Sequence, residues 1–93
     1  MYRTFSSLGL DYNCTLDQVI SELSNKGNAM LIVPVFKADY PNLSLASSGQ
    51  RHLLRVECPV LGYVAITDCD ISNGVCYFSS HDGSNYKPWT STK

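Results

Sequence analysis

Few side chains in this sequence could carry acid–base chemistry. There are two histidines, His52 and His81, and His81 is followed directly by Asp82. A hydrolytic site needs a nucleophile, a base and a carboxylate that orients the base. Neighbouring residues such as His81 and Asp82 usually lie in a solvated turn. His52 opens an apolar run, where packing is the simpler interpretation. We therefore expect no catalytic residues and no enzymatic activity.

The cysteines are the other candidates for chemistry. Cys14, Cys58, Cys69 and Cys76 are separated by 44, 11 and 7 positions, with no Cys-x-x-Cys pair and no Cys–His pair at a metal-ligand spacing. We expect no bound metal. The simplest interpretation is that all four are reduced and pack as small apolar side chains. Whether Cys69 and Cys76 form a disulfide stays an open question at this point. They would face each other across a four-residue turn but not across a two-residue turn at 73–74.

Charge and glycine placement argue against several kinds of partner. The chain has 7 basic and 8 acidic residues, and its basic residues are scattered, whereas nucleic acids and anionic membranes select a basic patch. No glycine-rich loop leads into a helix, so no nucleotide or other cofactor is expected. The longest apolar run, Ala29–Phe36, is far shorter than the roughly 20 residues of a membrane span. We expect neither membrane insertion nor a signal peptide.

A helix is the clearest of the elements that must position these residues. It is predicted over about residues 15–26, because Thr15 and Gln18 match a capping box and Gly27 follows a cation at the far end. Its apolar residues recur at i, i+3, i+4 and i+7, which predicts one buried stripe. The stripe consists of Leu16, Val19, Ile20 and Leu23.

The rest of the chain has the pattern of strands and turns. Strands are predicted at about 29–36, 52–58, 62–69 and 75–79. These stretches are rich in β-branched and aromatic residues, and the Asn73-Gly74 dipeptide predicts a hairpin between the last two. At 93 residues the chain has the size of a single domain. We therefore expect one α+β domain over residues 1–93, with an amphipathic N-terminal helix packed on a mainly antiparallel sheet of four to five strands.

Two long irregular stretches, 37–49 and 80–87, are the places where loops would carry function. Around the second stretch, aromatic side chains crowd together with polar ones, a mixture that suits sugar or protein recognition. These residues are Tyr77, Phe78, Asp82, Ser84, Asn85, Tyr86 and Trp89. For Tyr77, Phe78 and Trp89 the simpler alternative is that strand aromatics fill the core.

Several short segments, taken in chain order, resemble the distal domains of bacteriophage tail fibres. Ser7-Leu8-Gly9-Leu10, before the capped helix at 15–20, is similar to the opening of such domains. Later segments are similar to the strands, the hairpin and the closing Trp-Thr of knob-like domains on phage and pyocin fibres. These segments are 53–56, 64–67, 73–80 and Lys87-Pro88-Trp89-Thr90.

That resemblance implies a non-catalytic receptor-binding domain of a phage tail fibre or related particle, made in the host cytoplasm and carried on the virion. It implies attachment to a bacterial surface polysaccharide or outer-membrane protein, often as a homotrimer. Exposed loops would touch the receptor, and Trp89 would close the fold rather than bind. The residues expected at the receptor are Tyr40, His81, Asp82, Asn85 and Tyr86.

Other functions fit the same sequence. A small intracellular inhibitor or adaptor with one protein partner would have this size, this charge and reduced cysteines. A structural virion part, such as a connector or a trimerisation cap, would bind its own copies. An enzyme that uses a loop histidine is a further alternative, although no second catalytic group is visible beside His81.

Overall fold

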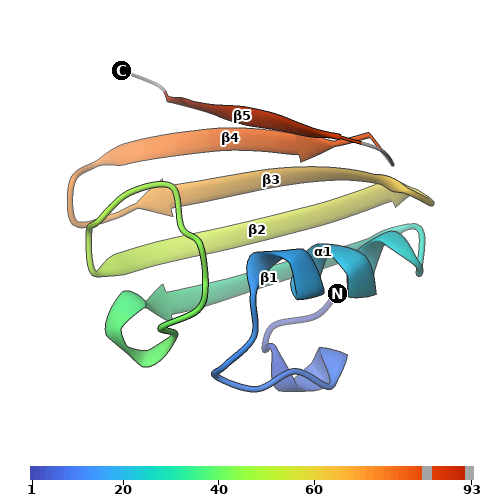
Figure 1. Cartoon of the computed structure of the whole chain (residues 1–93), viewed down its shortest axis with the longest axis horizontal. Coiled ribbons are helices and arrows are strands. Elements are labelled where there is room, and N and C mark those ends of the chain that lie inside the picture. The colour runs from blue at the N-terminus through green and yellow to red at the C-terminus, as the bar shows by residue number, and fades with distance from the viewer. Residues whose placement is uncertain (83–84, 92–93) are drawn as a thin grey trace.

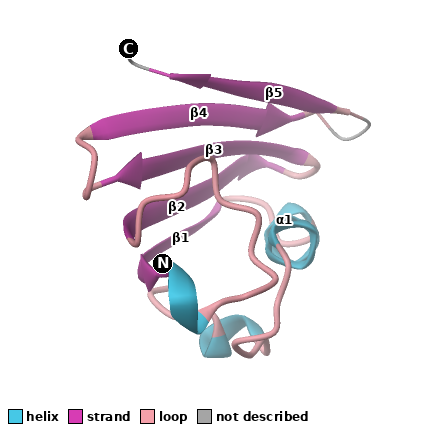
Figure 2. Cartoon of the chain, turned by 60° about the vertical axis from the view of Figure 1, so that its left-hand side comes forward, coloured by secondary structure: helices cyan, strands magenta, loops and turns pink. Residues whose placement is uncertain are grey.

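A computed structural model describes residues 1–82 and 85–91, including the backbone but not the side chain of Tyr86. In this part of the chain one α-helix packs on one face of a five-stranded antiparallel sheet, which confirms the predicted α+β class (Figures 1 and 2). The elements are η1 (Ser6–Leu8), α1 (Leu16–Ser24), β1 (Ala29–Phe36), η2 (Lys37–Asp39), β2 (Arg51–Val60), β3 (Tyr63–Asp70), β4 (Val75–His81) and β5 (Tyr86–Ser91).

α1 begins at the predicted capping box. The Thr15 hydroxyl accepts a hydrogen bond from the Gln18 backbone N–H at 3.2 Å, and the Gln18 side-chain oxygen accepts one from the Thr15 N–H at 2.9 Å. The predicted apolar stripe is buried, and its members are Leu16, Val19, Ile20 and Leu23. These contacts fix the first turn of the helix and the direction in which its side chains leave the backbone.

The C-terminal end of α1 differs from the prediction. The helix ends at Ser24 with Asn25 as its cap, so it is shorter than the expected 15–26. Gly27 (φ 65°) and Asn28 (φ 51°) then adopt left-handed backbone angles and turn the chain into β1. Glycine and asparagine tolerate this conformation best, which is why the reversal occurs at these two positions.

The strands follow one another in the sheet in chain order, and each pairs antiparallel with the next. Tyr2 pairs in parallel with Leu31 beside β1, so part of that edge is covered, and β5 forms the opposite edge. Residues 37–50 connect β1 to β2 and run across the face of the sheet that carries the helix (Figures 1 and 2).

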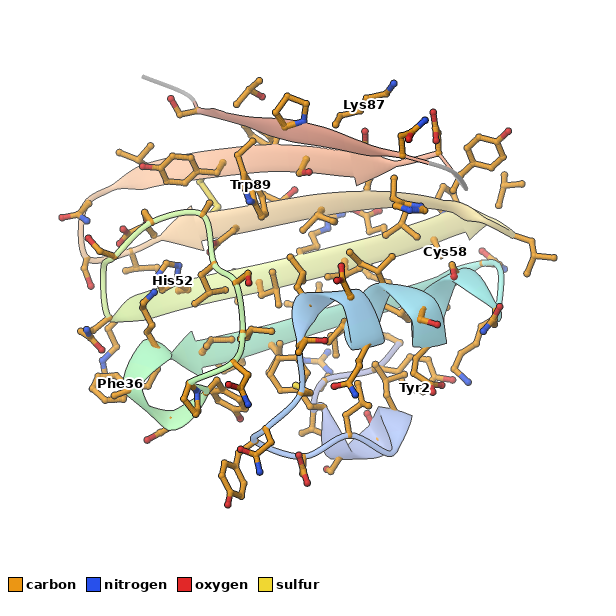
Figure 3. All side chains as sticks on the ribbon, in the orientation of Figure 1. Tyr2, Phe36, His52, Cys58, Lys87 and Trp89 are labelled. Carbon is orange, nitrogen blue, oxygen red and sulfur yellow. A yellow bond between two sulfur atoms is a disulfide. The ribbon has the colours of Figure 1, made fainter. Side chains whose placement is uncertain are left out.

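The core lies between the sheet and this helix-bearing face. Alternate strand residues point into it, as the period of a β-strand requires. From the sheet these are Leu31, Val33, Val35, Leu54, Val56, Cys58, Val64 and Ile66. α1 packs over β1, β2 and β3, whereas Trp89 of β5 lies farther across the same face and is partly buried against the core (Figure 3).

The cysteines divide into two pairs. Cys14 and Cys58 are free and buried, as expected, and burial raises the pKa of the Cys14 thiol. Cys69 and Cys76, whose pairing the sequence left open, form a disulfide between β3 and β4, so the simplest interpretation of four reduced cysteines does not hold for this pair. The two strands are joined by residues 71–74, a four-residue connection that places the two cysteines directly opposite each other, with their Cα atoms 4.0 Å apart.

Candidate functional site

The residue types that catalyse acid–base reactions come together beneath the loop that joins β1 to β2. His52, Asp68 and Asp70 are each at most 1% exposed. The His52 Nδ1 lies 2.6 Å from the Asp68 Oδ1, and the His52 Nε2 lies 2.5 Å from the Gly49 carbonyl oxygen. The Ser47 hydroxyl donates to the Asp70 Oδ2 at 2.5 Å. We call His52, Asp68, Asp70 and Ser47 the buried polar cluster.

The bonding inside this cluster differs from that of a hydrolytic triad. In the part of the chain that the structure describes, the Ser47 hydroxyl donates a hydrogen bond to Asp70 and not to His52. Both ring nitrogens of His52 face oxygen acceptors, so neither presents a lone pair to a substrate. The hydrogen bond from Ser47, followed by those from Asn73, holds the pKa of the Asp70 carboxyl below its usual range, although burial acts in the opposite direction. These hydrogen bonds hold the loop between β1 and β2 against the sheet.

The loop can approach the cluster this closely because position 49 is a glycine. A Cβ at Gly49 would overlap the carboxylate of Asp70. Asp70 cannot easily move aside, because its oxygens also accept hydrogen bonds from the Asn73 backbone at 3.1 Å and the Asn73 side chain at 2.8 Å. The Ala46 N–H donates to the Asp68 Oδ2 at 2.8 Å, so the loop is anchored at Ala46, Ser47 and Gly49.

The structure places the predicted receptor residues at opposite ends of the sheet. Tyr40 follows β1, and its ring packs edge-on against Phe5 with the ring centroids 5.0 Å apart. His81 ends β4 and Asp82 follows it; β4 runs antiparallel to β3 and therefore finishes at the other end of the sheet. The Asn85 N–H donates to the Asp82 Oδ1 at 2.9 Å. The side chain of Tyr86 lies outside the described residues. Tyr40 is therefore separated from His81, Asp82 and Asn85, which lie together at the end of β4 and just after it.

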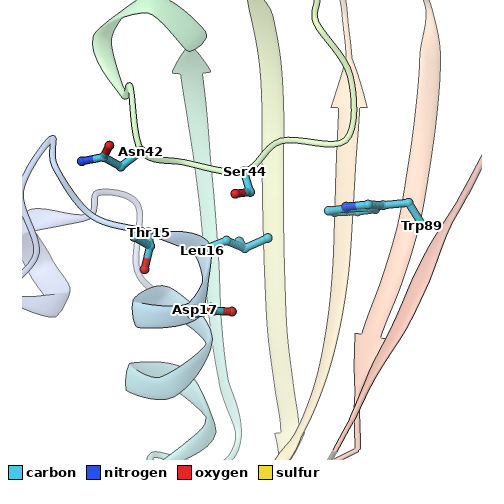
Figure 4. A pocket seen from close by; sticks show the side chains of 6 residues that line it. All are labelled: Thr15, Leu16, Asp17, Asn42, Ser44 and Trp89. Carbon is cyan, nitrogen blue, oxygen red and sulfur yellow. The ribbon is translucent and has the colours of Figure 1, made fainter.

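A different set of residues lines a hollow of about 320 Å³ on the helix-bearing face (Figure 4). It lies between the first turn of α1, the loop after β1 and the edge strand β5. The lining residues, which define the Trp89 hollow, are Thr15, Leu16, Asp17, Asn42, Ser44 and Trp89. The indole of Trp89 extends from β5 toward Leu16 and Ser44 and forms one wall (Figure 4).

Each wall of the hollow has a local cause. The capping box fixes Asp17 in the first turn of α1. Leu43 is buried in the core, so its neighbours Asn42 and Ser44 are held at the surface of the loop, and the Asn42 amide donates to the Asn13 carbonyl at 3.2 Å. On β5, Ser91 pairs with Tyr77 of β4. Trp89 lies two residues before Ser91, and its side chain points to the helix-bearing face, where it packs against the core.

The Trp89 hollow combines an aromatic surface with polar groups of several kinds. The indole offers a flat apolar face, Asp17 carries a carboxylate, Asn42 an amide and Ser44 a hydroxyl. A hollow with one apolar wall and a few converging polar groups is the usual form of a small-ligand site. Sequence reasoning missed this site because Trp89 was expected only to close the fold. The signal available was the polar segment 42–44 together with the exposed first turn of the helix.

Within residues 1–82 and 85–91, no group of three His, Cys, Asp or Glu side chains is placed to hold a metal ion. Among the same residues, the structure contains no helix with the length and apolar character that crossing a membrane requires. No protein-family model, curated protein or solved structure matches the chain.

Proposed function

We propose that this chain is a non-catalytic binding domain that attaches a phage tail fibre or a related particle to a bacterial surface, and that its ligand is a surface glycan bound in the Trp89 hollow. The single observation that carries the proposal is one open hollow lined by the Trp89 indole together with hydroxyl, amide and carboxylate side chains. The tail-fibre setting rests on the resemblance of the sequence segments described above.

A sugar ring has the chemistry that such a hollow can bind. One face of a pyranose presents C–H groups, which stack on an aromatic ring, while hydroxyls around its rim need hydrogen-bond donors and acceptors. Trp89 supplies the stacking surface, and Asn42 and Ser44 supply groups that both donate and accept. The hollow, at about 320 Å³, is at the small end of ligand sites and admits a short stretch of glycan.

A shallow site of this kind binds weakly on its own. Several copies on one particle would convert weak single contacts into firm attachment, because each later binding event is intramolecular. A homotrimeric fibre tip, as the resemblance implies, would provide those copies.

The disulfide favours this setting over an intracellular adaptor. Disulfides persist in oxidising surroundings and are rare in the reducing cytosol. Cys69 and Cys76 join two strands of the sheet, so their pairing supports a domain that works outside the cell. The nearly neutral charge of the chain is consistent with a neutral or mildly charged glycan rather than a strongly anionic polymer.

A protein receptor is the second candidate, and one surface favours it. The turn between β2 and β3 exposes three apolar side chains, Val60, Leu61 and Tyr63, each at least 56% exposed. Tyr63 also lines a separate hollow of about 190 Å³ together with His81 and Asp82. Protein interfaces are typically built from an aromatic anchor with a polar rim, so this end of the sheet is the surface for that alternative.

Binding to cells and to glycans separates the two candidates. We would label the domain, measure its binding to a panel of bacterial strains, and test it on an array of bacterial surface polysaccharides. The glycan proposal predicts that Trp89→Ala loses binding and that Trp89→Phe, which keeps a stacking ring, retains part of it. Tyr63→Ala should bind as the wild type does. Loss of binding in Tyr63→Ala but not in Trp89→Ala would instead support the protein receptor.

A further inference from the structure

One wall of the Trp89 hollow is held in place by residues that do not line it. Ser44 lies in the loop after β1, and the residues that follow it are bonded to the sheet. The Ala46 N–H donates to the Asp68 Oδ2 at 2.8 Å, and the Ser47 hydroxyl donates to the Asp70 Oδ2 at 2.5 Å. These anchors lie two and three positions along the chain from Ser44.

The next anchor is the Gly49 carbonyl, which accepts from the His52 ring at 2.5 Å. The other His52 nitrogen lies 2.6 Å from Asp68, so the histidine links the loop to the same carboxylate that holds Ala46. The segment is thus bonded at three points within four residues, and His52, Asp68 and Asp70 are buried. Hydrogen bonds to charged groups are stronger than those between neutral groups, particularly away from water.

We infer that Asp68 and Asp70 are positioning residues for the glycan site: through Ala46 and Ser47 they set the distance between Ser44 and the indole of Trp89. The inference rests on the proposed function, because it concerns the same hollow. Neither carboxylate touches the ligand. A loop released from them would keep the apolar contact of Leu43 but would no longer hold Ser44 opposite the indole.

Isosteric substitution provides a clean perturbation. In Asp68→Asn the volume is unchanged, but the carboxylate loses its charge and one of its two acceptor oxygens becomes an amide donor. The bonds to the Ala46 N–H and to the Nδ1 of His52 therefore lose their charged acceptor. Ser47→Ala removes the donor to Asp70, and Ser47→Thr restores a hydroxyl. Val56→Ala, in the core of β2, is the matched control because it destabilises the fold without removing any bond of the buried polar cluster.

Two readouts follow the loop directly. The first is affinity for the array polysaccharide that the wild type binds. The second is quenching of tryptophan fluorescence by acrylamide, which reports the exposure of Trp89 because the chain has one tryptophan. We expect Asp68→Asn and Ser47→Ala to weaken affinity about tenfold or more and to increase quenching, because lost preorganisation lowers affinity. Ser47→Thr should recover both, and Val56→Ala should change each by less than about twofold.

Asp68→Asn and Ser47→Ala variants with wild-type affinity and wild-type quenching would overturn the inference. Equal losses in Val56→Ala would also overturn it, because general destabilisation would then explain the effect. A wild type that binds no polysaccharide contradicts the proposed function instead. In that case the quenching alone decides: increased exposure in Asp68→Asn but not in Val56→Ala supports the positioning role, and unchanged exposure refutes it.

Discussion

Gly49→Ala is the sharpest test of how the loop is held. The added methyl would overlap the carboxylate of Asp70, which accepts hydrogen bonds from Ser47 and Asn73 and therefore cannot move without losing them. Overpacking a well-packed site costs about 1–3 kcal/mol, and losing one hydrogen bond to a charged group costs about 1.5–3 kcal/mol. Together these two costs lower the expected free energy of unfolding by about 2.5–6 kcal/mol.

Gly62→Ala is the matched control for that experiment. Gly62 has a left-handed backbone (φ 87°), but the space around its missing Cβ is open. The same substitution there costs only backbone strain, about 1–2 kcal/mol. Urea unfolding followed by circular dichroism measures both variants. A Gly49→Ala variant that is no less stable than Gly62→Ala would refute the close approach of the loop to Asp70.

Three further predictions test the fold. Leu23→Ala should lower the free energy of unfolding by about 2–5 kcal/mol and Gln18→Ala by about 1 kcal/mol or less; equal small effects in urea unfolding would contradict the buried stripe of α1. Because the pKa of Asp70 is lowered on folding, its carboxylate stabilises the protein above about pH 4, and this stabilisation is lost as the pH falls below that value. In Asp70→Asn the free energy of unfolding should therefore depend less steeply on pH in the acid range. An unchanged acid dependence would contradict this prediction. The disulfide between Cys69 and Cys76 closes a short loop with a sequence separation of 7, so its reduction should lower the free energy of unfolding by about 2.4 kcal/mol. Calorimetry with and without reductant measures this difference, and a much smaller one would contradict the prediction.

Local patterns predicted the parts of the fold that depend on neighbouring residues. Three such features lie where they were expected: the capping box of Thr15 and Gln18, the apolar stripe of α1, and the strand β1. Each depends on residues that are close together in the sequence. The prediction of an irregular stretch over 80–87 is wrong at both ends, because β4 continues to His81 and β5 begins at Tyr86. β5 was not assigned as a strand, since Pro88 interrupts a short segment that pairs as an edge.

The candidate site depended on contacts that no local pattern contains. Asp68 and Asp70 have the appearance of polar residues near a strand end, and His52 that of a packed strand residue. They meet because the β2–β3 register pairs His52 directly with Asp70 and Leu54 with Asp68. The Trp89 hollow likewise joins the first turn of α1, the loop after β1 and the last strand, whose proximity follows only from the complete sheet order.

The same dependence explains why the predicted receptor residues were scattered. Tyr40 and His81 both belong to loop regions in the sequence, but successive antiparallel strands send their connections to alternate ends of the sheet. The loop after β1 and the loop after β4 therefore lie at opposite ends, as Figure 1 shows. Loop position alone could not reveal that the loop after β1 faces Trp89 instead.

The central claim is that a glycan stacks on Trp89, and one titration tests it most directly. The labelled wild type is first used to select a binding polysaccharide from the array, and the unlabelled domain is then titrated with it while tryptophan fluorescence is recorded. The claim predicts a saturable change in emission whose midpoint matches the binding constant from calorimetry, and loss of calorimetric binding in Trp89→Ala with the fold intact by circular dichroism. Saturable binding that leaves the emission unchanged and survives Trp89→Ala would contradict it.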